Sequence, residues 1–300
     1  MESYSPDPES FLLTKELETL FYKLEFGTNE ESVQSAKEIS SLVPWKYSVF
    51  TIVDKLPDPV LRATSRQWVS QINKYKLEKK LTEISKAGAD FSYDRLEEGV
   101  YLLSSIASPA LDFSDFSKVF DGFAATIEEL FSASKEYLTD EEKCLLLARV
   151  LHKEVGLTGN RTDYENDSNS YISKVLETKT GNPISMSVIY LLVGKRLGLP
   201  LHGVNMPLHF LVQYESPTFF TYIDPFHDGM LLDRETCNKF LLLNGYNSSK
   251  KYFAKADTIT IFKRMYRNLI QIYRKKKDKS NESLCTSHLF ILENKKDTII

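Results

Sequence analysis

Apolar residues recur at helical spacing through the first half of the chain. Prolines and polar capping residues mark where these apolar segments begin and end, as at Pro44 and at Pro57-Asp-Pro59. The spacing therefore predicts a first half made of helices. The predicted helices cover residues 9–23, 33–42, 46–56, 60–72, 96–106, 113–133 and 140–155.

Two segments in this half are weakly alike. Residues 29–39 and 57–68 both begin with acidic residues or proline and continue as an apolar helix with a central alanine. Such a pattern is typical of a pair of HEAT-like repeats, and ordinary helices of a bundle fit it equally well. The charge-rich residues 74–80 read as a linker or a solvated face, so we expect a helical N-terminal segment over residues 1–85.

The pattern changes after Gly156. A polar loop and a short helix at 170–176 precede a helix at 183–197 that is apolar almost all round, as expected for a buried central helix. Short strands with helices after them complete the pattern, which predicts an α+β fold with a small antiparallel sheet. The strands are predicted at 202–204, 209–214, 219–224 and 230–232, the helices at 233–242 and 258–277, and a polar C-terminal tail at 279–300.

Composition narrows the class of protein. Hydrophobic residues make up 42% and charged residues 26% of the 300 residues, as in ordinary globular proteins, and the net charge of −3 offers no basic field for nucleic acid. The three cysteines form no paired motif, which favours a reducing compartment. The most apolar stretch, residues 187–194, is far shorter than the roughly 18 residues of a membrane span. With no signal-peptide pattern at the N-terminus, we expect a cytoplasmic protein without membrane association.

One pair of predicted strands brings an imidazole and a carboxylate together. If residues 215–218 form the hairpin loop, Tyr214 faces Phe219, and counting back places His209 opposite Asp224. Directly opposed residues have Cβ atoms about 5 Å apart. The aspartate then orients the imidazole as in acyl-transfer triads, or the two form a purely structural hydrogen bond.

The start of the buried helix is where a nucleophile would be expected. A helix N-terminus lowers the pKa of a thiol and stabilises an oxyanion, but Asn182-Pro-Ile-Ser185 contains no cysteine. Ser185 is the nearest hydroxyl. Serine in a first helical turn is also an ordinary capping residue, so both interpretations stand.

Other candidate sites are weaker. His202, His209, His227 and Cys237 have no recognised metal-ligand spacing, so we expect no metal. The glycines form no phosphate-binding motif, so we expect no cofactor. The basic residues between Arg264 and Lys279 are typical of a solvated helix end, which argues against a nucleic-acid partner.

Three stretches carry a family resemblance. Residues 168–190, 196–213 and 223–229 resemble the SirB-type transglutaminase-like proteins, and the similarity extends over about residues 90–278. The resemblance implies a papain-like core in which a central buried helix packs on a small antiparallel sheet. His209 matches the family's histidine and Asp224 its aspartate.

The same resemblance reveals departures from the catalytic pattern. The cysteine position falls within residues 183–185 and holds no cysteine, which is shared by the SirB-type branch. Leu208 replaces the usual glycine, which narrows access to His209, and Gln213 replaces an arginine that could meet an anionic ligand.

We therefore expect a non-catalytic binding or regulatory module, with a protein or peptide as its partner. The alternative is a hydrolase or acyltransferase that uses Ser185, His209 and Asp224. In either case the binding cleft combines the His–Asp pair with a polar rim of Asn160, Asn169, Tyr171 and Asn182.

Overall fold

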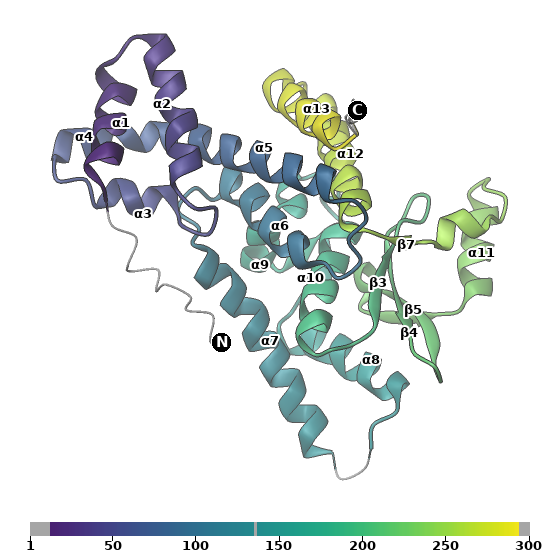
Figure 1. Ribbon diagram of the computed structural model, residues 1–300. Coiled ribbons are helices and arrows are strands. Elements are labelled where there is room, and N and C mark those ends of the chain that lie inside the picture. Colours follow the sequence, from purple (N-terminus) through teal and green to yellow (C-terminus); the bar gives the residue numbers. More distant parts are fainter. Residues whose placement is uncertain (1–12, 135–136, 294–300) are drawn as a thin grey trace, which may run out of the picture. The chain divides into compact units, whose positions relative to one another are not determined.

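Two units make up the chain. The computed structural model describes residues 13–134 and 137–293 (Figure 1). Unit 1 comprises the described residues up to Lys80 together with Glu98–Ser117, and unit 2 comprises Leu81–Glu97 and the described residues from Lys118 onward.

Unit 1 is helical, as its apolar spacing predicts. Helices α1 to α4 each start with a polar cap, such as the reciprocal pair of Thr28 and Glu31 at α2 or Asp58 before Pro59 at α4. An apolar cluster that includes Phe21 and Ile39 packs between these helices. The helices are α1 (Lys15–Phe26), α2 (Asn29–Leu42), α3 (Val49–Asp54), α4 (Pro59–Ser65) and the first part of α5 (Val69–Ala87). Residues 9–12 of the first predicted helix lie outside the described residues, and the HEAT-like pairing stays a prediction.

The charge-rich residues 74–80 are neither the linker nor the fully solvated face that the sequence pattern suggests. They belong to α5, and Lys76 and Lys80 are buried rather than solvated. Lys76 Nζ donates to the carbonyls of Pro44 and Tyr47 at 3.1 and 2.7 Å, and Lys80 Nζ lies 2.8 Å from a Glu98 carboxylate oxygen. Long lysine stems bury apolar carbons when the terminal nitrogen finds acceptors, which the charge count alone does not reveal.

Residues 98–117 belong to unit 1, although they fall inside the predicted transglutaminase-like domain. The Asn73 side-chain amide donates to the Ser105 carbonyl at 3.3 Å, and the rings of Trp45 and Phe113 lie 4.6 Å apart. These residues come from α6 (Asp94–Ala107) and the start of α7 (Phe113–Ala133). The domain boundaries of 1–85 and 90–278 stay a prediction.

Unit 2 combines helices with small sheets, in keeping with the predicted α+β class. Helix α10 (Pro183–Arg196) is buried from Pro183 to Gly194 and contacts β3 and β4 (Figure 1). The five-stranded antiparallel sheet has the order β6-β5-β4-β3-β7, and β1 (Thr158–Gly159) pairs in parallel with β2 (Thr180–Gly181). Its strands are β3 (Leu201–Val204), β4 (Leu211–Glu215), β5 (Phe220–Asp224), β6 (Met230–Leu232) and β7 (Lys255–Ala256).

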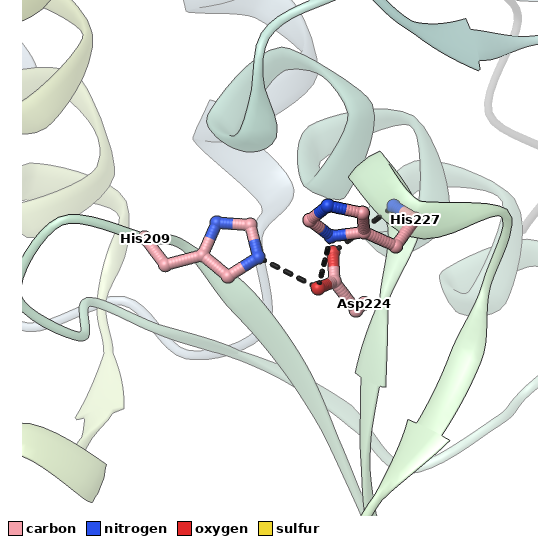
Figure 2. A group of neighbouring side chains, drawn as sticks. All are labelled: His209, Asp224 and His227. Atoms are coloured by element: carbon pink, nitrogen blue, oxygen red, sulfur yellow. Dashed lines mark hydrogen bonds and ion pairs between the residues drawn. The ribbon is translucent and has the colours of Figure 1, made fainter. Parts of the chain in front are cut away.

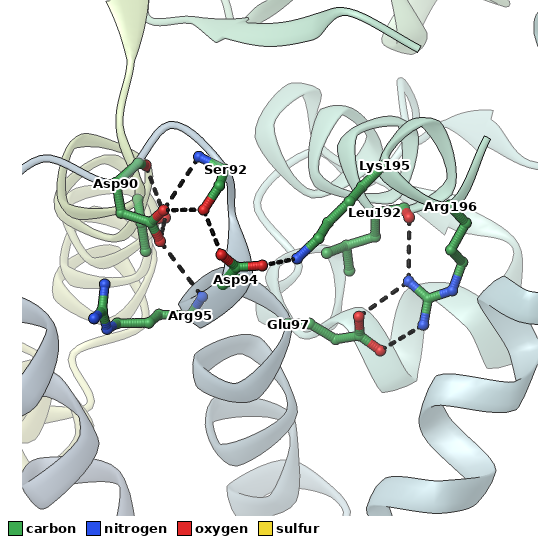
Figure 3. Close-up of polar contacts among 9 residues, drawn as sticks. Asp90, Ser92, Asp94, Arg95, Glu97, Leu192, Lys195 and Arg196 are labelled. Carbon is green, nitrogen blue, oxygen red and sulfur yellow. Dashed lines mark hydrogen bonds and ion pairs between the residues drawn. The ribbon is translucent and has the colours of Figure 1, made fainter. Parts of the chain in front are cut away.

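Ion pairs hold the C-terminal end of α10 in unit 2. Arg196 donates two parallel hydrogen bonds to Glu97, at 3.0 and 2.8 Å, and Lys195 pairs with Asp94 (Figure 3). Both cations lie at the negative pole of α10, as the sequence suggests. The other helices are α8 (Asp140–Arg149), α9 (Ile172–Thr178), α11 (Arg234–Leu243) and α12 (Thr258–Lys276).

The first part of the predicted polar tail is a helix. Residues Lys279–Glu293 form helix α13, which packs on α12. Cys285, His288 and Leu292 are buried along one face of α13. Their spacing of three and four residues makes a narrow apolar stripe that the polar composition hides. Residues 294–300 lie outside the described residues.

Within residues 13–134 and 137–293, no helix combines the length and the apolar character needed to cross a membrane.

Candidate functional site around His209 and Asp224

The hairpin that carries the candidate site has a different register from the predicted one. Tyr214 pairs with Thr221 and Val212 with Ile223, and the loop covers residues 216–219. The prediction is therefore wrong by two residues, and His209 precedes β4 instead of facing Asp224 across it. Side chains alternate with a period of two, so a two-residue change keeps each residue on its face.

His209 and Asp224 nevertheless meet. His209 Nε2 donates to Asp224 Oδ2 at 2.7 Å, and both side chains are buried (Figure 2). His227 Nδ1 donates to the same oxygen at 2.8 Å, so two imidazoles converge on one carboxylate oxygen. The His227 side chain is 45% exposed, so the group is open to solvent on that side.

The second oxygen of Asp224 fixes the carboxylate. Asp224 Oδ1 accepts the backbone N–H groups of Phe226 at 3.1 Å and His227 at 3.2 Å, which caps the 3₁₀ turn Pro225–His227. Burial by itself raises the pKa of Asp224, but the hydrogen bonds and charges of His209 and His227 outweigh burial and hold this pKa below its usual value. The carboxylate is therefore ionised at neutral pH.

The turn after Asp224 packs tightly against two helices. Asp228 and Gly229 both have positive φ, and the Gly229 N–H donates to the Asp224 carbonyl at 2.9 Å. A Cβ at position 229 would lie 2.5 Å from Ala148 Cβ and 2.6 Å from the Tyr190 hydroxyl. Position 229 therefore requires glycine, and the turn that carries His227 rests on α8 and α10.

Leu208 occupies a backbone conformation that favours glycine. Its φ is +64°, and its side chain is 51% exposed. A β-carbon in the left-handed region costs free energy that glycine avoids. The glycine that the family resemblance implies here would therefore fit the backbone better than this leucine does.

Aromatic rings surround His209. The ring of Phe226 lies 6.3 Å away and that of Phe240 6.2 Å away, and Tyr164 contacts Phe226 edge-on at 6.0 Å. Phe240 and Tyr164 are partly exposed. The polar group thus has an aromatic border that solvent reaches.

Ser185 forms hydrogen bonds with Asn182. Its side chain is 0% exposed, and its hydroxyl donates to the Asn182 carbonyl and accepts the Asn182 N–H, both at 3.0 Å. Asn182 Oδ1 in turn accepts the Ser185 N–H at 3.0 Å, which completes a capping box at the start of α10. Among the residues that the structure describes, no hydrogen bond joins Ser185 to His209.

The four predicted rim residues bond to one another or to the surrounding fold. Asn160 Nδ2 donates to Asn169 Oδ1 at 3.0 Å, and the Asn182 N–H donates to the Asn169 carbonyl at 3.3 Å. The Tyr171 hydroxyl meets that of Tyr273 at 2.7 Å. Asn169, Tyr171 and Asn182 are buried. Within the described chain, none of the four hydrogen-bonds to His209, Asp224 or His227.

The three cysteines are buried thiols. Burial raises the pKa of Cys144 and Cys285 to about 12 and that of Cys237 to about 11. Thiolate is the reactive form of cysteine, so none of these side chains is prepared for nucleophilic attack at neutral pH.

His227 is the site residue that the sequence analysis did not assign. It follows Asp224 by three residues, with Pro225 between them. An aspartate that caps a short turn brings its side chain close to the residue three positions later. The Asp-Pro-x-His spacing is therefore the local signal that could have predicted this contact.

The candidate site lies within the part of the chain that is similar to known proteins. A family model described as the transglutaminase-like superfamily matches residues 116–267. A UPF0162 protein of Xylella fastidiosa is 35% identical over 153 residues, which are 49% of this chain and 54% of that protein. F-box only protein 21 of Mus musculus is 35% identical over 131 residues (41% of this chain, 20% of that protein).

A more distant relative is protein SirB1 of Salmonella typhimurium. It is 28% identical over 156 residues, which are 51% of this chain and 56% of SirB1. The matched region thus spans about half the length of the UPF0162 and SirB1 proteins. No solved structure matches the chain.

Proposed function

This chain belongs to the transglutaminase-like superfamily, and we propose that it is a non-catalytic binding or regulatory module of that superfamily. His209, Asp224 and His227 are its polar contact with the ligand, and the ligand is a protein or peptide segment. A module of this kind keeps the imidazole–carboxylate pair of the fold without a nucleophile beside it.

The burial and the hydrogen bonds of Ser185 are the main support for this proposal. A serine nucleophile must reach both its substrate and a general base. Ser185 is fully buried, and its hydroxyl makes both of its hydrogen bonds with the backbone of Asn182. Attack by Ser185 would require the start of α10 to open. The raised pKa values of the buried cysteines argue in the same direction.

The surroundings of His209 support binding of a peptide. Leu208, which precedes His209, and Phe240, whose ring lies 6.2 Å from that of His209, are both exposed. Exposed apolar side chains around a few fixed polar groups are typical of surfaces that bind other chains. Apolar contacts then supply affinity, and the imidazoles supply hydrogen-bonding specificity.

The second candidate is a hydrolase or acyltransferase that uses Ser185, His209 and Asp224. The His209–Asp224 hydrogen bond of 2.7 Å favours it, because this is the bond that orients a general base in acyl transfer. This candidate needs a conformation in which Ser185 leaves its capping box.

Covalent probes separate the two candidates. The full chain is treated with a serine-directed fluorophosphonate and a cysteine-directed iodoacetamide, as wild type, as His209→Ala and as the control His202→Ala. We expect no labelling that depends on His209. Labelling of wild type and His202→Ala that disappears in His209→Ala would establish the enzyme instead.

A peptide array tests binding directly. The full chain is applied to the array as wild type, as Phe240→Ser and as the control Phe290→Ser, which changes an exposed ring on α13. We expect wild type and Phe290→Ser to bind the same peptides and Phe240→Ser to lose at least tenfold in affinity. Equal binding by all three proteins, or no bound peptide at all, contradicts the proposal.

A further inference from the structure

Three potential metal-ligand atoms converge at the candidate site. His209 Nε2, Asp224 Oδ2 and His227 Nδ1 all lie within 4.8 Å of one another (Figure 2). Both histidines approach the same carboxylate oxygen, at 2.7 and 2.8 Å. An ion about 2.0–2.2 Å from each of three ligands needs them roughly 3–3.5 Å apart, so small movements would convert these hydrogen bonds into coordination.

We propose that His209, Asp224 and His227 form a binding site for one divalent transition-metal ion, with zinc as the best fit. Two imidazole nitrogens and one carboxylate oxygen are a donor set that suits zinc. Hard cations such as magnesium and calcium prefer sites made of oxygens alone.

The carboxylate is already oriented for this role. Two backbone N–H groups hold Asp224 Oδ1, so Oδ2 is the oxygen presented to the two rings. Hydrogen bonds that orient a ligating carboxylate strengthen metal sites. The tight packing of Gly229 on Ala148 and Tyr190 fixes the turn from which His227 extends.

The site also leaves room for entry and for a further ligand. His209 and Asp224 are buried on one side, whereas the His227 side chain is 45% exposed. Three protein ligands with an open side leave a coordination position for water or for an oxygen of a bound partner. A metal ion here could therefore contact a carboxylate or carbonyl of the ligand peptide.

This inference revises the sequence-based expectation of no metal. That expectation rested on the spacing of histidines along the chain, whereas the ligands come from the loop before β4, the end of β5 and the turn after it. The inference goes beyond the proposed function and does not depend on it, because an ion can bind whether or not a peptide does.

Zinc titration tests the site. The full chain is stripped with a chelator, desalted and titrated with zinc chloride by calorimetry, and cobalt(II) is added separately to read visible absorption. We expect one zinc per chain and a cobalt spectrum of low coordination number. His227→Gln and Asp224→Asn should each weaken zinc binding by at least tenfold, and His202→Gln, which changes a histidine outside the group, should not.

Circular dichroism of each variant controls for folding. His227→Gln alters a partly exposed side chain, so this variant stays folded even if Asp224→Asn does not. Absence of zinc binding by wild type, or zinc binding that His227→Gln leaves unchanged, overturns the inference. Either result can occur while the peptide array still shows binding that depends on Phe240, so failure of the metal site and failure of the proposed function are distinguishable.

Discussion

Asp224 shows how much one side chain organises at the scale of the residue. One oxygen accepts hydrogen bonds from two imidazoles and the other from two backbone amides. The sequence predicted that His209 and Asp224 lie close together, but it did so from a hairpin register that differs by two residues from the observed one. The two side chains still meet because His209 Nε2 reaches the Asp224 carboxylate from the loop before β4.

Gly229→Ala is expected to destabilise the protein strongly. The alanine would have to adopt positive φ, and its Cβ would clash with Ala148 and Tyr190, so we expect a loss of about 2–5 kcal/mol in unfolding free energy. Gly245→Ala is the matched control, because Gly245 also has positive φ but nothing lies within 4 Å of its added Cβ. Denaturant titration measures both. Equal losses would show that packing at position 229 is unimportant.

The burial of Lys76 leads us to expect that the stability of the protein depends on pH. Burial lowers the pKa of Lys76 from 10.5 to about 7 in the folded chain. Between these values the unfolded chain binds a proton that the folded chain does not, so the unfolding free energy rises from pH 7 to pH 10.5, by about 3–5 kcal/mol. Below pH 7 both states are protonated at this side chain, and the contribution of Lys76 to stability is at its lowest.

Tryptophan fluorescence is a suitable measurement for this prediction, since both tryptophans, Trp45 and Trp68, lie in unit 1 with Lys76. Lys76→Met should remove the rise between pH 7 and 10.5. Lys79→Met, which changes an exposed lysine of the same helix, should keep it. A rise that survives in Lys76→Met would assign it to another group.

At the scale of the elements, capping residues and apolar stripes determine where the helices form. Reciprocal caps at Thr28, Thr139 and Asn182 begin α2, α8 and α10, where short-range sequence signals place helix starts. The sequence indicates α13 only weakly, because its buried stripe is narrow and one of its members is a histidine. Whether such a stripe forms a stable helix depends on α12, which covers it.

Leu292→Ala tests whether α13 is an integral element. Leu292 is buried and Phe290 is exposed on the same helix. We expect Leu292→Ala to lower the unfolding free energy by about 2–4 kcal/mol and Phe290→Ala to change it by less than about 0.5 kcal/mol. Denaturant titration followed by circular dichroism gives both values. Equal, small effects would mean that the C-terminal helix contributes nothing to stability.

At the scale of the whole molecule, each of the two units is built from two separate stretches of the chain. Residues 98–117 belong with the N-terminal helices, and their contacts include the Asn73–Ser105 hydrogen bond and the edge-to-face contact of Trp45 with Phe113. Sequence similarity alone placed this segment in the transglutaminase-like domain. A domain cut at residue 90 therefore separates side chains that are buried against one another.

A fragment of residues 90–300 should therefore be less stable than the full chain. Tyr101 and Phe113 would lose the ring of Trp45, and the buried Ser105 carbonyl would lose the Asn73 amide. We expect a lower melting temperature and binding of a hydrophobic dye such as ANS. A fragment with the stability of the full chain and no dye binding would instead support the boundary at residues 85–90.

The sequence by itself determined the helices with strong apolar periodicity, the buried character of α10 and the α+β class. These follow from patterns within a few residues, where backbone geometry and capping act. The tertiary structure decided the hairpin register, the enclosure of Ser185, the burial of Lys76 and the approach of His227 to Asp224. Burial and hydrogen-bond partners depend on which distant segments pack together, and no local pattern specifies that.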